Sequence, residues 1–279
     1  MKLIDCFMYF DEDLVLEIRL NTLYDIVDKF VIVEAKQDHA GKNKSLNFQI
    51  EKFKNFKDKI HYIVVEDISK KKDFKRKDWH ENHARDQFQR NSLSQGYADC
   101  LPDDLIMISD IDEIPDPKKI KEFNLKSKYA CFLQKNYQSK LNLLNVTNQL
   151  WPGTKICQKK YLKSPQWLRN IKDKKYSFFR LDTYFSEKKY INLIIIDNGG
   201  WHFSNIKTAN EIEYKLKSYL HHREFDINPM TTKEIENIIK NKQAIYDLTV
   251  DKTVNKIGNG NKLEKFPLKN ELHLATGTE

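Results

Sequence analysis

The first 110 residues alternate between short apolar runs and helical segments, and this alternation constrains the fold more than any other feature. The apolar runs cover residues 3–10, 30–33, 60–65 and 105–109. Helices are expected between them, from Asp11 to about residue 26, over 45–56 and over 78–96. Strands separated by helices form right-handed βαβ units. The sequence therefore predicts an α/β fold with a mostly parallel sheet flanked by helices.

The second half of the chain has a less regular pattern. Strands are expected over residues 129–138, 154–161 and 191–196, and amphipathic helices over 208–219 and 231–245. The first two of these strands could pair antiparallel, which predicts a smaller antiparallel portion. No low-complexity linker divides the chain, so we expect a single domain over residues 1–250. A polar tail over 251–279 follows it, with loose packing after about residue 263.

Composition and cysteine spacing indicate a soluble, cytoplasmic protein. Apolar residues make up 40% of the 279 positions, enough for a sizeable core. No stretch reaches the roughly 18 uninterrupted apolar residues that a membrane helix needs. Asp5 interrupts the amino-terminal apolar run, so the run reads as a strand rather than a signal peptide. The four cysteines are widely spaced, which fits a reducing compartment.

The chain carries a formal charge of +8, and its lysines are unevenly distributed. Three basic groups stand out, at residues 70–77, 159–163 and 172–175. Such runs are commonly solvated loops, but they can also attract an anionic partner. One alternative hypothesis is therefore a basic module that binds nucleic acid or another anionic surface.

An acidic cluster follows the apolar run at residues 105–109. Asp110 and Asp112 lie two residues apart, and in an extended segment they share one face. Two adjacent carboxylates repel each other unless a positive charge lies between them, and hard oxygen ligands favour Mg²⁺ or Mn²⁺. Such an ion would bridge the phosphates of a nucleotide diphosphate. The alternative is a strand-end turn, where aspartate is favoured for its local backbone hydrogen bonds.

A phosphatase of the haloacid-dehalogenase type is an enzymatic alternative. These enzymes also place an Asp-x-Asp motif after an apolar strand, with the first aspartate as nucleophile. They usually carry Thr or Val two residues after the second aspartate, near the amino terminus. Here Ile114 stands at that place and several elements precede the motif.

Four blocks in order give the chain its resemblance to glycosyltransferase family 17, the β-1,4-mannosyl-glycoprotein 4-β-N-acetylglucosaminyltransferase family. They are residues 5–12 with Glu17, Arg19 and Leu20; residues 30–35 with Gly41 and Lys42; residues 89–91 ahead of 109–115; and residues 199–204. The resemblance implies a GT-A fold and metal-dependent, inverting transfer from a UDP-sugar, with UDP-N-acetylglucosamine as the expected donor. The animal members are Golgi membrane proteins, and this chain has no apparent anchor. Their acceptor, a core mannose of N-glycans, is therefore not carried over.

The resemblance also suggests roles for individual residues. Asp110 and Asp112 match the metal-binding pair, and His202 follows two glycines where such enzymes often supply a histidine ligand to Mn²⁺ or Mg²⁺. The expected donor-binding residues are Glu34, Arg90, Asn91, Asp110, Gly200 and Trp201. Arg85 and Trp79 are weaker candidates. The structural alternatives are a turn-capping role for Glu34, a helix pair for Arg90, and core packing for His202 and the tryptophans.

Inverting transfer needs a general base that takes the proton of the acceptor hydroxyl. Asp197, at the end of an apolar run, is the candidate, and Glu187 and Glu211 are alternatives. Asp112 is the residue whose loss should abolish turnover. The expected partners are a UDP-sugar and a glycan or other hydroxyl-bearing acceptor, which could itself be anionic, even modified DNA.

Overall fold

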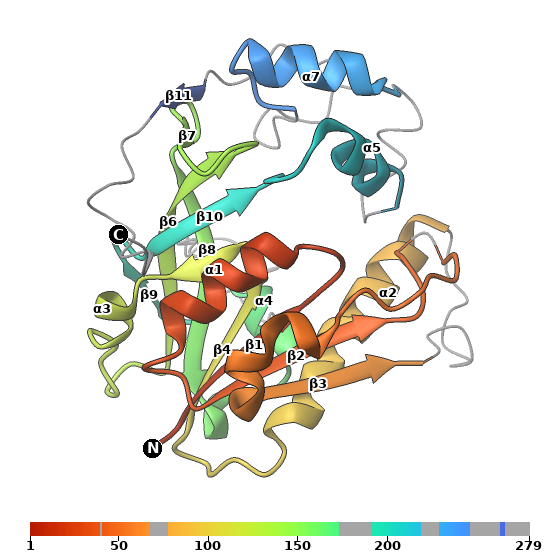
Figure 1. Ribbon diagram of the computed structural model, residues 1–279. Coiled ribbons are helices and arrows are strands. Elements are labelled where there is room, and N and C mark those ends of the chain that lie inside the picture. Colours follow the sequence, from red (N-terminus) through yellow and green to blue (C-terminus); the bar gives the residue numbers. More distant parts are fainter. Residues whose placement is uncertain (40, 67–77, 173–190, 219–228, 246–262, 266–279) are drawn as a thin grey trace, which may run out of the picture.

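The structure, a computed structural model, describes residues 1–39, 41–66, 78–172, 191–218, 229–245 and 263–265 (Figure 1). Within these residues, eleven strands form one sheet in the order β11-β7-β6-β8-β4-β1-β2-β3, with β5, β9 and β10 attached beside this path. Helices lie on both sides of the sheet. The predicted α/β class is confirmed.

The first half of the chain forms the parallel part of the sheet. Its strands are β1 (Leu3–Met8), β2 (Lys29–Ala35), β3 (Ile60–Val65) and β4 (Leu105–Asp110). All neighbouring pairs among these four are parallel, so their carboxyl ends reach the same edge of the sheet. That edge is where open α/β sheets bind their ligands.

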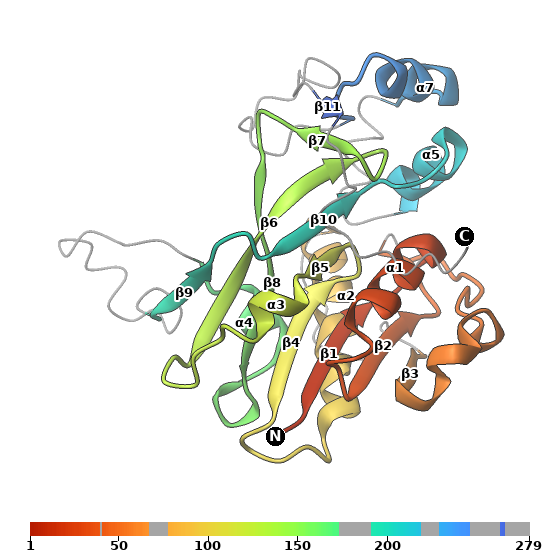
Figure 2. The ribbon, with the colours of Figure 1, turned by 60° about the vertical axis from the view of Figure 1, so that its left-hand side comes forward.

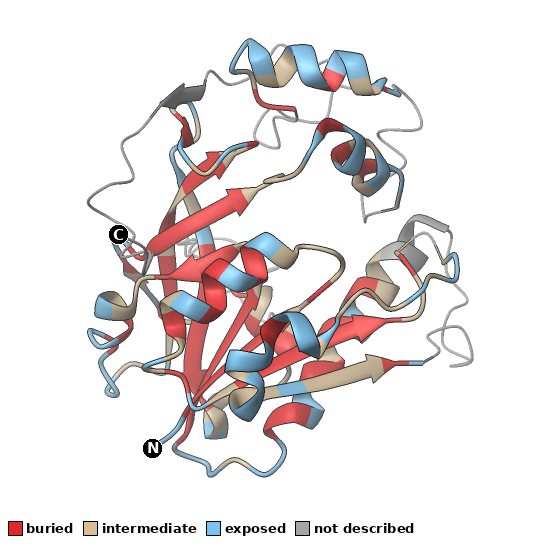
Figure 3. Cartoon of the chain, viewed as in Figure 1, coloured by how far each residue is buried: buried red, intermediate tan, exposed pale blue. Residues whose placement is uncertain are grey.

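Two apolar cores cover the two faces of this parallel part. Alternate residues of β1 enter different cores, since Phe7 packs with helix α1 (Asp13–Leu23) and Cys6 packs on the opposite face. The second face is covered by helix α2 (Asp78–Ser92), the 3₁₀ segment η2 (Leu93–Tyr97) and helix α4 (Pro165–Arg169). Figure 2 shows α1 and α2 on opposite sides of β1 and β4. In Figure 3 the buried residues are concentrated on these strands and on the inner sides of the helices.

The second half adds the expected antiparallel portion. Strand β8 (Leu150–Gln158) lies antiparallel between β4 and β6 (Tyr129–Gln138). Strands β9 (Leu193–Ile196) and β10 (Gly200–Ser204) both run parallel to β6, one after the other along its edge. The remaining short strands are β5 (Glu113–Pro115), β7 (Leu143–Asn145) and β11 (Leu263–Lys265).

The short helices complete the fold. They are α3 (Pro117–Ile120), η3 (Lys159–Tyr161), α5 (Ala209–Ser218) and α7 (Thr232–Lys240). Helices α5 and α7 share a small apolar cluster that includes Ile212, Leu216 and Ile235. Thr231 and Glu234 form a capping box that fixes the start of α7.

Three sequence-based expectations differ from the structure. The helix expected over residues 45–56 is a 3₁₀ segment, η1 (Ile50–Lys59), in which Phe53 is the buried residue. The second amphipathic helix ends at Lys240 rather than at 245. Residues 263–265 pair with β7, although loose packing was expected there, and residues 266–279 lie outside the described part. The domain boundary at residue 250 stays a prediction, because residues 246–262 also lie outside it.

Candidate active site

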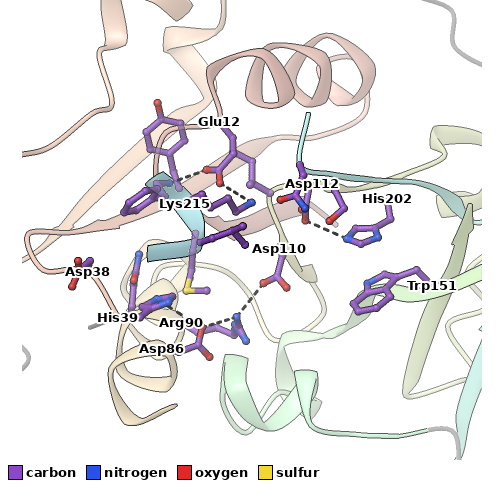
Figure 4. A pocket seen from close by; sticks show the side chains of 18 of the residues that line it. Glu12, Asp38, His39, Asp86, Arg90, Asp110, Asp112, Trp151, His202 and Lys215 are labelled. Atoms are coloured by element: carbon purple, nitrogen blue, oxygen red, sulfur yellow. Dashed lines mark hydrogen bonds and ion pairs between the residues drawn. The ribbon is translucent and has the colours of Figure 1, made fainter. Parts of the chain in front are cut away.

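A cavity of about 420 Å³ lies at the carboxyl ends of β1, β2 and β4 (Figure 4). One end is built from residues 8–12, residues 37–39 and 86–90. Asp110 and Asp112 lie in the middle. His202 and Trp151 lie beyond them, on the side of β10 and β8. Lys215 and Leu216 of α5 also line the cavity, so the second half of the chain helps to enclose a site that the first half begins.

Arg19, on α1, holds the acidic turn in place. Its side chain is fully buried and makes a bidentate ion pair with the equally buried Asp5 of β1, at 2.6 and 2.7 Å. The remaining guanidinium N–H groups donate to the Ser109 hydroxyl and to three backbone carbonyls of the turn, those of Asp110, Ile111 and Glu113. These carbonyls face a cation rather than water, which fixes the backbone that carries both aspartates.

Two arginines bracket Asp110. One carboxylate oxygen accepts a hydrogen bond from Arg90 of α2 and the other from Arg169 of α4, each at 3.0 Å. Burial alone would raise the pKa of Asp110, but the Arg169 and Arg90 guanidiniums lower the pKa to about 2. Asp110 is thus a permanent carboxylate with both oxygens already engaged.

Glu113 holds Arg169 in place. Its fully buried carboxylate accepts two hydrogen bonds from Arg169, at 2.7 and 2.8 Å, and one from the Trp151 indole at 2.8 Å. Trp151 in turn stacks on the His202 ring, with centroids 4.6 Å apart and planes 13° apart. The acidic turn, α4 and the tryptophan therefore form one connected polar network.

His202 and Asp112 face each other across the middle of the cavity. His202 Nε2 lies 3.7 Å from Asp112 Oδ1, and His202 Nδ1 lies 3.2 Å from Asn136 Oδ1. The orientation of the Asn136 amide is fixed, because its Nδ2 donates to the Asn148 carbonyl at 3.1 Å. In its neutral form, His202 donates its Nδ1–H to Asn136 and presents the lone pair of Nε2 to Asp112.

A cation bound between Asp112 and His202 would satisfy both acceptor atoms. A histidine lone pair and a carboxylate oxygen that face each other, with a neighbouring group fixing the ring, form a usual half of a metal site. Burial raises the pKa of Asp112, with His202 acting in the opposite direction. Among the described residues, no three His, Cys, Asp or Glu side chains cluster closely enough to hold an ion alone. The residues thus fit a metal whose other ligands come from substrate and water.

The predicted metal-binding residues are therefore only partly brought together. Asp112 and His202 meet, whereas Asp110 points to the two arginines. Of the predicted donor-binding residues, Arg90 lines the cavity with Asp110. The side chain of Asn91 turns away, and its carbonyl oxygen accepts the backbone N–H of Gln166 at 3.0 Å.

Glu34 has a structural role in place of the predicted donor contact. It is fully buried, and its oxygens accept hydrogen bonds from the Lys44 ammonium, the backbone N–H groups of Asn47 and Phe48, and the Tyr62 hydroxyl. These bonds fasten the segment after β2 against the sheet. No oxygen of Glu34 is left for a ligand.

Gly200 and Trp201 also serve the fold rather than the cavity wall. Gly200 has φ +125°, and an added Cβ would meet the Ile114 carbonyl oxygen at 2.2 Å. Trp201 is 5% exposed and belongs to the larger core. Both residues lie where β10 pairs with β5, and this pairing positions His202, which follows Trp201 directly.

Of the candidate general bases, neither Asp197 nor Glu211 lines the cavity. Asp197 is exposed on the turn between β9 and β10, and it lies near Lys119 of α3. Glu211 caps the start of α5 by accepting hydrogen bonds from the backbone and hydroxyl of Thr208. Glu187, Lys70–Lys77 and the side chain of Trp79 lie outside the described residues. Arg85 donates to the His39 carbonyl at 3.3 Å and is not among the cavity-lining residues.

Several functional residues escaped the sequence reasoning. Arg169, Trp151 and Lys215 come from segments without a motif, and only the tertiary fold brings them to the acidic turn. Arg19 and Glu113 did fall within the blocks that carry the family resemblance. Arg19 is a charged residue on the apolar face of α1, and a charge at such a position could have drawn attention to it.

No helix in the described part of the chain is both long and apolar enough to cross a membrane. This finding agrees with the absence of long apolar stretches in the sequence.

Comparison with known proteins identifies a family for this chain. Residues 1–257 match the family model described as glycosyltransferase family 17. No curated protein matches the chain. One solved structure, described as the crystal structure of a mycobacterial protein, has 10% sequence identity and a TM-score of 0.36. The match covers 95% of this chain and 84% of that one, and a likeness of this size carries no argument.

Proposed function

The chain belongs to glycosyltransferase family 17, and from that membership we propose metal-dependent, inverting transfer of N-acetylglucosamine from UDP-N-acetylglucosamine to a hydroxyl acceptor. Its sheet has the GT-A-like arrangement, with the cavity at the carboxyl ends of the parallel strands. Membership establishes glycosyl transfer. The sugar, the nucleotide, the metal and the stereochemistry belong to the proposal, and the metal is supported by Asp112 Oδ1 and His202 Nε2, which face each other at 3.7 Å.

The charge of the cavity supports a divalent cation. Five carboxylates line it, from Glu12, Asp38, Asp86, Asp110 and Asp112, against three permanent cations. Burial lowers the pKa of His39, although the nearby Asp86 opposes the shift, so this histidine adds no charge near neutral pH. A nucleotide diphosphate is strongly anionic. It would be repelled from this cavity unless a cation accompanied it.

We assign the metal to Asp112 and His202, with diphosphate oxygens and water as further ligands. Bound there, Mn²⁺ or Mg²⁺ would neutralise the charge that develops on the departing UDP. Asn136 fixes the tautomer and ring orientation of His202. Groups that hydrogen-bond to a metal-binding histidine usually have this role. Asp110 keeps Arg90 and Arg169 in place beside the diphosphate position.

Lys215 supplies a further positive charge from α5. Its ammonium lies 3.5 Å from Glu12, a long ion pair, and its side chain is 20% exposed. Burial opposes its charge, but Glu12 and Asp112 raise its pKa, so it remains protonated. A diphosphate between Glu12 and Asp112 would compete for this ammonium, which supports a role for Lys215 in holding the leaving group.

Gln37 supports a pyrimidine at the opposite end of the cavity. Its Nε2 donates to Asn43 Oδ1 at 3.2 Å, while its Oε1 is buried without a hydrogen-bond partner among the described residues. An unpaired buried acceptor in a cavity wall costs free energy until a ligand donor reaches it. The N3–H of uracil is such a donor.

The two alternative functions fit the site less well. A phosphatase nucleophile needs a free carboxylate oxygen, whereas both oxygens of Asp110 are bound by arginines. A basic binding module gives no reason for an acidic cavity in a chain of charge +8.

The test is UDP release from a panel of nucleotide-sugars, with and without Mn²⁺. We expect slow, metal-dependent release from UDP-N-acetylglucosamine. Asp112→Asn should abolish that release, whereas Asp103→Asn, at an exposed site before β4 and so at the other end of that strand from the motif, should not change it. Release that persists in Asp112→Asn, or that needs no metal, would contradict the assignment.

A further inference from the structure

One wall of the cavity is built from neutral polar side chains. Its six residues, the amide wall, are Asn136, Gln138, Asn145, Asn148, Ser204 and Asn205. They come from β6, β7 and the turn after it, and the end of β10. The wall begins at His202, because Asn136 contacts that ring, so it lies at the opposite end from Asp38, His39 and Asp86 (Figure 4).

Asn145 gives the clearest sign that a ligand belongs there. Its side chain is 1% exposed and its Oδ1 accepts the backbone N–H groups of Thr147 and Asn148, at 3.2 and 2.9 Å. These two donors fix the amide orientation, which leaves Nδ2 as the free group. Nδ2 is buried without a hydrogen-bond partner in the described part of the chain. A buried N–H donor on a cavity wall therefore awaits an acceptor.

The neighbouring residues offer further unused groups. The side chains of Gln138, Asn148 and Asn205 make no hydrogen bond with another described residue, and each lines the cavity at intermediate exposure. Amides both donate and accept, as sugar hydroxyls do. The half-buried indole of Trp151 lies beside this wall and offers the apolar surface on which a pyranose ring can pack.

Charge decides what kind of molecule fits. The six residues of the amide wall carry no cation, and Asp112 faces the His202 ring at which the wall begins. A sulfated or uronic-acid acceptor would place its charge against a wall that offers no counter-ion. A neutral saccharide would meet matched donors and acceptors and would add no charge.

We propose that the amide wall binds the acceptor, and that the acceptor is a neutral saccharide. This inference rests on the proposed function, because it takes the diphosphate to lie at Asp112 and His202. The acceptor hydroxyl then approaches the donor sugar from the side of β6 and β10. Asn145 Nδ2 donates to an oxygen of the acceptor, and Gln138 contacts a second hydroxyl.

The test uses the full chain and a set of neutral oligosaccharides with their sulfated and uronic-acid counterparts. Binding is measured with UDP and Mn²⁺ present, and separately without them. Two variants remove single groups from the wall. Asn145→Asp keeps the oxygen that caps the turn and removes the Nδ2 donor, and Gln138→Leu removes an amide at nearly constant volume.

Each variant has a matched control. Asn124 Oδ1 caps a similar turn by accepting the Lys126 N–H at 2.9 Å, on an exposed segment, so Asn124→Asp is the control for Asn145→Asp. Gln149 is exposed in the turn that carries Asn148 and does not line the cavity, so Gln149→Leu is the control for Gln138→Leu.

We expect wild type to select neutral over acidic oligosaccharides, and each wall variant to weaken that binding by about tenfold. Both controls should bind as wild type does. Preference for acidic saccharides, or wall variants equal to their controls, would overturn the inference. An equal loss of UDP affinity in the wall variants would also overturn it, because the wall would then hold the donor. If UDP fails to bind wild type, the proposed donor is wrong, while binding of neutral saccharides that depends on Asn145 would still support the wall.

Discussion

Arg19 is the residue on which the acidic turn most depends. It joins α1 to three backbone carbonyls of the turn, those of Asp110, Ile111 and Glu113, and to Asp5 on β1. Buried ion pairs contribute little net stability compared with apolar replacements, but removing one partner leaves an uncompensated buried charge. The pair therefore serves to fix one backbone conformation, on which the placement of Asp112 depends.

Removing this cation should be costly. Arg19→Met leaves Asp5 buried and unpaired, so we expect a loss of about 3–5 kcal/mol in the free energy of unfolding, measured by urea denaturation. The double variant with Asp5→Leu should recover most of that loss. Lys29→Met, which breaks the exposed pair with Asp99, should cost less than about 1 kcal/mol. Similar losses for Arg19→Met and Lys29→Met would show that Arg19 has no special role.

Asp110 should contribute to stability in a pH-dependent way. Its pKa is lowered to about 2 in the folded protein, so the unfolded chain takes up the proton first as the pH falls. The contribution is present above about pH 4 and is lost toward pH 2. The side chain is 38% exposed, so solvent screening limits it to about 1 kcal/mol. Urea unfolding at pH 7 and pH 3 should show a smaller acid loss in Asp110→Asn, and an identical loss would contradict the ion pairs.

At the scale of residues, the sequence predicts those functional groups that lie next to a strand end. Asp110 and Asp112 lie at the end of β4, whereas His202 lies within β10 and was identified by the glycines before it. Arg169 could not be found in this way, because it reaches Glu113 across 56 residues of chain. The expected donor-binding role of Glu34 was misleading for a related reason. It does end a strand, but the segment containing Lys44, Asn47 and Phe48 folds back over it.

At the scale of elements, β10 is the strand that links the fold to the site. It runs parallel to β6 and antiparallel to β5, and carries His202 between them. The predictions based on apolar runs missed β5, β7 and β10, because strands of three to five residues are too short to show a period. Long strands with flanking helices were predicted within a few residues.

Gly200 permits the close approach of β10 to β5. Gly200→Ala should cost more than about 3 kcal/mol in the free energy of unfolding, because a Cβ would meet the Ile114 carbonyl at 2.2 Å in addition to the strain of a positive φ. Gly41→Ala is the matched control. Its φ is +86°, but the three atoms nearest the added Cβ belong to the Arg85 guanidinium, which can move. Equal losses in the two variants would indicate that the β5–β10 contact is looser than described.

At the scale of the whole molecule, the double core predicts which thiols react. Cys6, Cys131 and Cys157 are at most 1% exposed, and Cys100 is partly exposed. Burial raises the pKa of Cys157 to about 12 and that of Cys6 well above its usual value, which suppresses their thiolates. Native protein treated with iodoacetamide at pH 8 should be modified at Cys100 first, and at all four thiols only in urea. Early modification of Cys157, located by mass spectrometry, would contradict the packing of β8.

The molecule combines a net charge of +8 with a cavity in which carboxylates outnumber permanent cations. Composition alone indicated anionic partners. It could not show that carboxylates outnumber cations in the cavity of a chain whose net charge is positive. Under the proposed function, metal dependence would follow from the charge of the whole cavity as well as from the two residues proposed as ligands.

Calorimetric titration of the wild-type protein with UDP, in Mn²⁺ and in a chelator, tests this account most directly. We expect binding in Mn²⁺ and an affinity at least about 100-fold lower without it, since an anionic ligand would then enter an acidic cavity unaccompanied. UDP binding of equal affinity in the chelator would contradict the account. It would show that the cations of the cavity suffice and that Asp112 and His202 face each other for another reason.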